Sequence, residues 1–219
     1  MKRMLKKPDW VSGITHVVGA VLAVIGLVAL MRVALAAGTV WHVISFAVFG
    51  VSLILLYTAS SFYHLFPADD KLRLWLRRVD HMMVFVLIAG TYTPFCLIAL
   101  RGTWGWTLLI AVWSLSFIGI VMKVVWLLAP RWLYTGFYLL LGWLVVIAIG
   151  PLWRGVPLAA LAWLGMGGLF YTVGAVFYGT KWPKLVPHVF GFHELWHLFV
   201  MAGSSAHFWA VYRYLSRMD

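Results

Sequence analysis

The residues best suited to chemistry in this sequence are two histidines, His193 and His197, which stand four positions apart with Glu194 between them. In a helix, positions four apart lie on one face, so both imidazoles could reach a single metal ion. The surrounding segment is apolar, and polar side chains inside an apolar membrane span are energetically unfavourable. We therefore take this pair as the starting point of a candidate metal site.

The composition is that of an integral membrane protein. The chain has 219 residues, of which 64% are hydrophobic and 11% are charged, and its mean hydropathy is +0.96. Its formal charge of +11 comes from basic residues in short segments between apolar runs, where they would face anionic lipid headgroups. Because the sequence contains no separate basic soluble domain, this charge does not indicate a nucleic-acid partner. Cys96 is the only cysteine, which excludes an intrachain disulfide.

Seven apolar runs, each about 20 residues long or more, are long enough to span a membrane. The predicted helices cover residues 11–35, 40–65, 79–100, 104–128, 132–149, 156–178 and 189–214. The first run is too long for the apolar part of a cleavable signal peptide, so we expect it to be retained. The sequence thus predicts an all-α bundle of seven transmembrane helices that forms a single domain over 1–219. In the sixth helix, Gly165, Gly167, Gly168 and Gly174 would permit close contact with a neighbour.

The distribution of basic residues predicts the orientation of this bundle. An odd number of spans places the two ends of the chain on opposite sides of the membrane. With the amino terminus inside, the inner segments carry 12 Lys and Arg residues and the outer segments carry 5. This asymmetry favours a cytoplasmic amino terminus and a carboxyl terminus outside.

This topology brings polar residues from three helices to one depth near the cytoplasmic face. His64 lies near the inner end of the second predicted helix, and Asp80 lies at the inner start of the third. His193 and His197 fall in the first turns of the last helix, which also starts inside. Ser60 precedes His64 by one turn on the same face. We therefore expect these five side chains to converge.

The converging residues match the ligand set of a catalytic zinc site. Three histidines, here His64, His193 and His197, commonly hold Zn²⁺ and leave a fourth position for water, whose pKa then falls to about 7. Asp80 would bond that water or act as a general base, and Ser60 would position a ligand or a substrate carbonyl. The alternative is that His64 reaches the headgroup boundary and Asp80 pairs with Arg77, Arg78 or a backbone amide.

With Glu194, the histidine pair also matches the zinc-protease pattern His-Glu-x-x-His, in which the glutamate is the general base. The extended pattern requires a glycine and a histidine where this sequence has Val200 and Gly203. An intramembrane metalloprotease would therefore need another third ligand, such as Asp80. Glu194 lies about 100° around the helix from His193 and can instead face the headgroup boundary.

The other histidines have weaker claims to the metal. His16 lies near the inner end of the first helix and would support a ligand from outside the coordination sphere. His207 lies ten residues beyond His197, about 15 Å along a helix, so we expect it to line the same cavity further out. His81 follows Asp80 but points about 100° away from it. We interpret His42 and His188 as structural.

Several motifs together resemble a known family. They are Ser12-Gly13-Ile14-Thr15-His16, Ser60-Ser61-Phe62-Tyr63-His64, Arg78-Val79-Asp80-His81, His193-Glu194-Leu195-Trp196-His197 and His207-Phe208. In this order they look like the signature of the hemolysin III family, the bacterial branch of the progestin and adipoQ receptor (PAQR) superfamily, which is distantly related to alkaline ceramidases. The resemblance covers nearly the whole chain. It implies seven helices with a cytoplasmic amino terminus, a zinc ion on His64, His193 and His197, an aspartate matching Asp80 and a serine matching Ser60.

The same resemblance implies a function in membrane lipid chemistry. The receptor branch and the ceramidases hydrolyse lipid amides, which makes a zinc-dependent hydrolase with a membrane lipid as its substrate the leading hypothesis. In bacteria it suggests a role in lipid homeostasis in the inner (cytoplasmic) membrane. The alternatives are a non-enzymatic sensor of membrane fluidity with a structural zinc, a pore-forming hemolysin, and a haem site on paired histidines.

Overall fold

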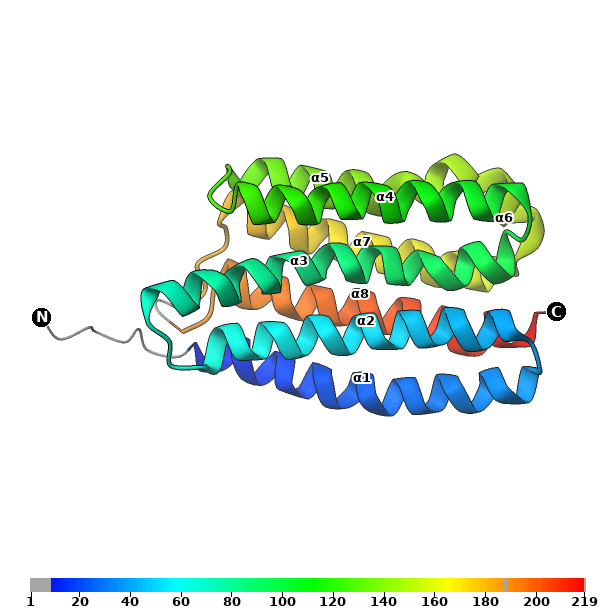
Figure 1. Ribbon diagram of the computed structural model, residues 1–219, viewed down its shortest axis with the longest axis horizontal. Helices are drawn as coiled ribbons and strands as arrows, with labels where there is room; N and C mark the ends of the chain where they lie inside the picture. The colour runs from blue at the N-terminus through cyan, green and yellow to red at the C-terminus, as the bar shows by residue number, and fades with distance from the viewer. Residues whose placement is uncertain (1–8, 187–188, 219) are drawn as a thin grey trace, which may run out of the picture.

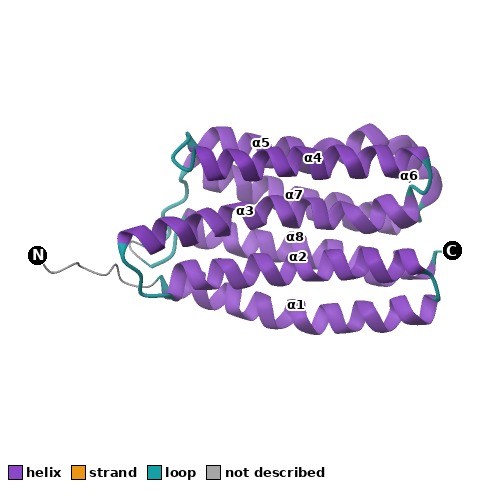
Figure 2. Ribbon diagram, in the orientation of Figure 1, coloured by secondary structure: helices purple, strands orange, loops and turns teal. Residues whose placement is uncertain are grey.

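The computed structural model describes residues 9–186 and 189–218 and is a bundle of helices (Figures 1 and 2). The elements are α1 (Trp10–Ala37), α2 (Val40–Leu65), α3 (Asp70–Pro94), η1 (Phe95–Ala99), α4 (Thr103–Val125), α5 (Arg131–Trp143), η2 (Leu144–Ala148), α6 (Ile149–Gly155), α7 (Leu158–Thr180), α8 (Phe192–Arg213) and η3 (Leu215–Arg217). In the described residues, extended structure is limited to an isolated bridge between Val186 and Phe190.

Six helical segments are long and apolar enough to cross a membrane. They are Trp10–Ala36, Val40–Leu65, Asp70–Ala99, Thr103–Val125, Arg131–Gly155 and Leu158–Thr180. The protein is therefore a multi-pass membrane protein. The last helix, α8, has 22 residues and packs against α1 and α7, but it carries the polar residues of the candidate site. That α8 is the seventh span stays a prediction.

The third helix begins at Asp70, well before the predicted start at residue 79. Asp69 caps it, because its side chain accepts the backbone N–H of Leu72 at 2.9 Å. The basic segment 71–78, which lies between two predicted helices, therefore forms the first turns of α3. At the other end, the helix passes into the π-helical segment η1 directly after Pro94, which lacks a backbone N–H.

The fifth apolar run continues beyond its predicted end at residue 149. The 3₁₀ segment η2 joins α5 to α6, and α6 extends to Gly155. Pro151 does not end the helical segment. It lies in the first turn of α6, where a backbone N–H would have no hydrogen-bond partner within the helix.

Small residues let α7 and α8 pack closely. A side chain at Gly174 would collide with Phe199, and one at Gly167 would collide with the ring of His207. Gly165 and Gly168 differ from our expectation, because nothing lies within 4 Å of their Cβ positions and both line an internal cavity. Only part of this glycine-rich face is therefore a helix contact.

The residues of the candidate site lie at helix ends that meet at one end of the bundle. The start of α1, the end of α2, the start of α3 and the start of α8 all lie at one end of the bundle, on the left in Figure 1. The outward faces of the helices carry large exposed apolar side chains, such as Val21, Ile25 and Val28 on α1. Such faces suit contact with lipid.

Candidate metal centre

The structure brings together the three histidines that the sequence analysis selected. His64 lies in the last turn of α2, and His193 and His197 lie in the first two turns of α8. Each offers one ring nitrogen, and these nitrogens lie within 4.8 Å of one another. The Nε2 atoms of His64 and His193 are 3.2 Å apart. Two nitrogens bound to one tetrahedral zinc at about 2.0–2.1 Å would be separated by about 3.3 Å. The three side chains can therefore hold a metal ion.

In His64 and His197, a contact at Nδ1 orients the ring and leaves Nε2 facing the other histidines. The Nδ1 of His64 lies 3.4 Å from Oδ2 of Asp9, and the Nδ1 of His197 lies 3.1 Å from the carbonyl oxygen of Ser12. Because a carbonyl oxygen only accepts, Nδ1 of His197 must carry the proton, which leaves the Nε2 lone pair for a metal. Such outer contacts commonly orient histidine ligands.

Asp9 was missed by the sequence analysis. It caps α1 by accepting the backbone N–H of Ser12 at 3.2 Å, and its own N–H donates to the carbonyl of His64. Burial alone would raise the pKa of Asp9, but its hydrogen bonds with His64 and Ser12 outweigh burial and hold that pKa well below its usual range. The cap could have been found from an aspartate before an apolar run, whereas its contact with His64 depends on the packing of α1 against α2.

Glu194 has a structural role in this arrangement. Its Oε2 accepts the backbone N–H of Gly191 at 2.6 Å, which caps the start of α8. Its Oε1 accepts the Ser12 hydroxyl at 3.2 Å, which ties α8 to α1. Because both oxygens are engaged and Glu194 does not line the cavity beside the histidines, it is poorly placed as the base of a protease.

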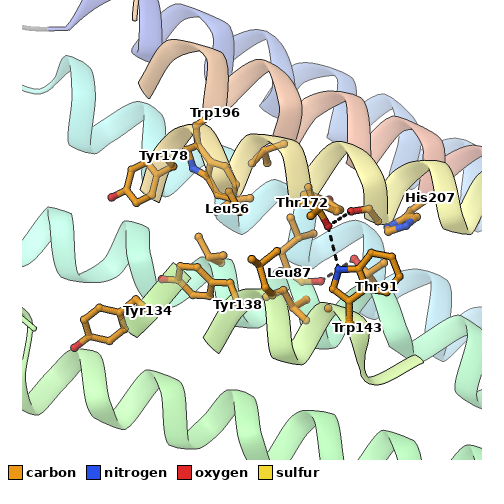
Figure 3. A pocket seen from close by; sticks show the side chains of 18 of the residues that line it. Leu56, Leu87, Thr91, Tyr134, Tyr138, Trp143, Thr172, Tyr178, Trp196 and His207 are labelled. Carbon is orange, nitrogen blue, oxygen red and sulfur yellow. Dashed lines mark hydrogen bonds between the residues drawn. The ribbon is translucent and has the colours of Figure 1, made fainter. Parts of the chain in front are cut away.

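A cavity of about 240 Å³ lies beside the histidines and is lined mainly by apolar and aromatic side chains (Figure 3). Ser60, Asp80, His193 and His197 all border it. Asp80 is 8% exposed, and its carboxylate accepts a hydrogen bond from the Ser60 hydroxyl. The neighbouring His81 places Nε2 4.0 Å from Oδ2 of Asp80 and does not join the three-histidine group.

Two further histidines, His16 and His207, lie near His197 and in the cavity wall, respectively. The ring of His16 stacks on that of His197, with centroids 3.7 Å apart and an interplanar angle of 15°. His207 lines the same cavity, and its Nε2 lies 3.0 Å from the carbonyl oxygen of Leu164. His42 is fully buried and bonds Thr39 and the carbonyl of Leu215, in keeping with a structural role, and His188 lies outside the described residues.

Lys123 departs from its expected place. The predicted orientation includes Lys123 among the 12 basic residues of the inner segments, but it lies in the last turn of α4 and is 3% exposed. Its side chain lines the cavity together with Arg77 and Asp80. Nothing in the local sequence distinguishes a lysine directed into the bundle from one directed at the headgroups, because both can lie at the end of an apolar run.

Comparison with known proteins agrees with the motifs. The chain is 42% identical over 208 residues to the hemolysin-3 homolog of Bacillus subtilis (strain 168), covering 95% of this chain and 94% of the relative. It is 40% identical over 219 residues to hemolysin-3 of Bacillus cereus, covering 98% and 96%. A more distant match, 25% identical over 210 residues, is the human monocyte to macrophage differentiation factor of the PAQR family, covering 93% and 82%. The family model described as "Haemolysin-III related" matches residues 5–208, and the chain therefore belongs to the hemolysin III family.

Proposed function

We propose that this protein is a zinc-dependent hydrolase that cleaves an amide or ester of a membrane lipid and so contributes to lipid homeostasis in the bacterial cytoplasmic membrane. One observation carries the proposal: of the three histidines that can hold a metal ion, His193 and His197 border the same largely apolar cavity as Asp80 and Ser60. An apolar cavity with a few convergent polar groups is the usual form of a site for an apolar substrate.

The residues around the cavity have separate roles in this reaction. When bound, zinc supplies a Lewis acid for the scissile carbonyl and lowers the pKa of a water molecule. Asp80 would accept a proton from the attacking water and return it to the leaving amine or alcohol when the carbon–heteroatom bond breaks. Ser60 holds the Asp80 carboxylate through its hydroxyl, so it is a positioning residue.

A second candidate is a non-enzymatic regulator in which zinc only joins helices. It is favoured by the contacts that surround the histidines, because His64 bonds Asp9, His197 bonds Ser12, and Ser12 bonds Glu194. These contacts already tie α1, α2 and α8 together at one end of the bundle. A metal at this point would strengthen that junction whether or not it performed chemistry.

The two functions differ in what they require of Asp80. Purified full-length protein loaded with zinc would be tested for release of fatty acid from ceramide and phospholipids, with Asp80→Asn as the variant and the exposed Asp70→Asn as its control. The hydrolase proposal predicts that Asp80→Asn lowers turnover by about 10²–10⁴-fold while zinc is retained. If wild type releases no more fatty acid than Asp80→Asn, and Asp80→Asn restores the lipid composition of deletion cells, the regulator is the better account.

A further inference from the structure

The wall of the cavity carries more positive than negative charge. Arg77, Lys123 and Arg131 all line it, and Asp80 is the one carboxylate among its described lining residues. Burying charge in apolar surroundings is unfavourable unless a partner of opposite charge accompanies it. Lys123 is buried and Arg77 and Arg131 are half-buried, and one aspartate leaves an excess of positive charge at the cavity wall.

Lys123 is the most deeply buried of these cations. Its Nζ lies 3.0 Å from the centroid of the Tyr134 ring, and the hydroxyl of Tyr134 is itself bonded to the carbonyl of Trp126. A ring face offers electrostatic attraction but no oxygen to accept the ammonium N–H groups. Within the described residues, Lys123 makes no salt bridge. Its donors are therefore available to a ligand in the cavity.

Arg77 joins Lys123, whereas Arg131 is already engaged. Arg77 lies one turn before Asp80 on α3, so both side chains reach the cavity from one face. Lys123 and Arg77 are close enough to repel each other electrostatically. Arg131 donates to the carbonyl of Tyr178 at 3.1 Å, and its guanidinium lies 4.5 Å from the centroid of the Tyr178 ring.

We propose that Lys123 and Arg77 form a subsite for the anionic head group of an amphiphilic lipid, a phosphate or a carboxylate, bound in the cavity beside the three histidines. The hydrocarbon part of such a ligand has an apolar wall to follow, which includes Leu56 and Leu87 (Figure 3). This inference rests on the proposed function and deepens it, because it makes the preferred lipid an anionic one. An ammonium and a guanidinium are both suited to these anions.

The test compares three amphiphiles that share one acyl chain: a lysophosphatidic acid, a fatty acid and a neutral monoacylglycerol. Binding to the detergent-solubilised full chain is measured by tryptophan fluorescence, with and without prior removal of metal by a chelator. We expect at least one anionic amphiphile to bind about tenfold more tightly than the monoacylglycerol, as a charged hydrogen bond would give. The stronger of the two anions identifies the head group.

Variants test whether Lys123 and Arg77 cause the preference for an anionic amphiphile. Lys123→Met and Arg77→Gln should each remove most of the preference for the anion, and Lys123→Arg should keep it. The exposed Lys71→Met, at the start of α3, is the matched control and should behave as wild type. Equal binding of the anionic and neutral amphiphiles to wild type would overturn the inference, as would an unchanged preference in Arg77→Gln or in a folded Lys123→Met. Binding is also measured without metal. If the protein prefers the anion but hydrolyses no lipid, the proposed hydrolase function is wrong and the anion subsite stands.

Discussion

At the scale of single residues, the candidate centre depends as much on the groups behind the ligands as on the ligands. Asp9 and the carbonyl of Ser12 each occupy the Nδ1 side of a histidine, and this leaves Nε2 for a metal. A carboxylate behind an imidazole also raises its basicity as a ligand. Asp9 should therefore affect metal affinity without touching the metal.

Replacing Asp9 with asparagine tests this role. Asparagine caps a helix about as well as aspartate, so α1 should keep its start. We expect Asp9→Asn to weaken zinc affinity by about 10–100-fold, the usual effect of losing such a partner, as measured by competition with a chelator. Asp70→Asn, at an exposed position in α3, removes the same charge and should leave the affinity unchanged. An unaltered affinity in Asp9→Asn would show that the contact with His64 has no influence on the metal.

Glu194 provides the opposite case, a residue that completes a catalytic motif but caps a helix. The side-chain carbonyl of glutamine can still accept the Gly191 N–H. Glu194→Gln should therefore retain both its zinc content and its rate of lipid hydrolysis. Metal analysis and the hydrolysis assay on the same preparation check this. Retained zinc with abolished hydrolysis would restore the glutamate as a general base.

At the scale of elements, the apolar runs of the sequence predicted most of the helices but not all of their boundaries. The apolar runs placed α1, α2, α4 and α7 within about two or three residues of their observed bounds. The start of α3 was predicted too late because the Lys- and Arg-rich segment 71–78 is not apolar, although these residues favour helix and Asp69 supplies the cap. His64 and the α8 pair were identifiable from spacing and depth. Asp9 and Lys123 were not, since their roles depend on which helices pack together.

The contact between α7 and α8 positions His193 and His197, and Gly174 is one of its tight points. An added Cβ there would lie 2.7 Å from Cβ of Phe199, which cannot move without shifting the helix. Gly174→Ala should destabilise the bundle by about 1–3 kcal/mol, measured by thermal unfolding in detergent. Gly136→Ala in α5 is the control, because nothing lies within 4 Å of its Cβ position. Equal stability of the two variants would show that α7 and α8 tolerate a wider spacing.

At the scale of the whole molecule, α8 decides the topology. The described part of α1 begins at one end of the bundle and α8 ends at the other (Figure 1). The polar residues that make up the candidate site are also those that lower the hydropathy of α8. In this account α8 is less apolar because it carries the candidate site, and its packing against α1 and α7 compensates within the bundle.

Reporter fusions test the seven-span arrangement. Alkaline phosphatase, which is active outside the cytoplasm, should be active when fused after the carboxyl terminus, and green fluorescent protein should be dark at the same place. A fusion at Pro130, after four predicted spans, should show the reverse pattern. A fluorescent carboxyl-terminal fusion would mean that α8 does not cross the membrane in the predicted direction.

Metal analysis of the purified chain tests the central claim most directly. Protein prepared without chelators should contain about one zinc per chain. His64→Ala, His193→Ala and His197→Ala should each lose it, because each removes one of the three ligand nitrogens. His207→Ala should keep it, because that histidine lies outside the group. Wild-type protein without bound metal, or full zinc content in the three ligand variants, would contradict the account.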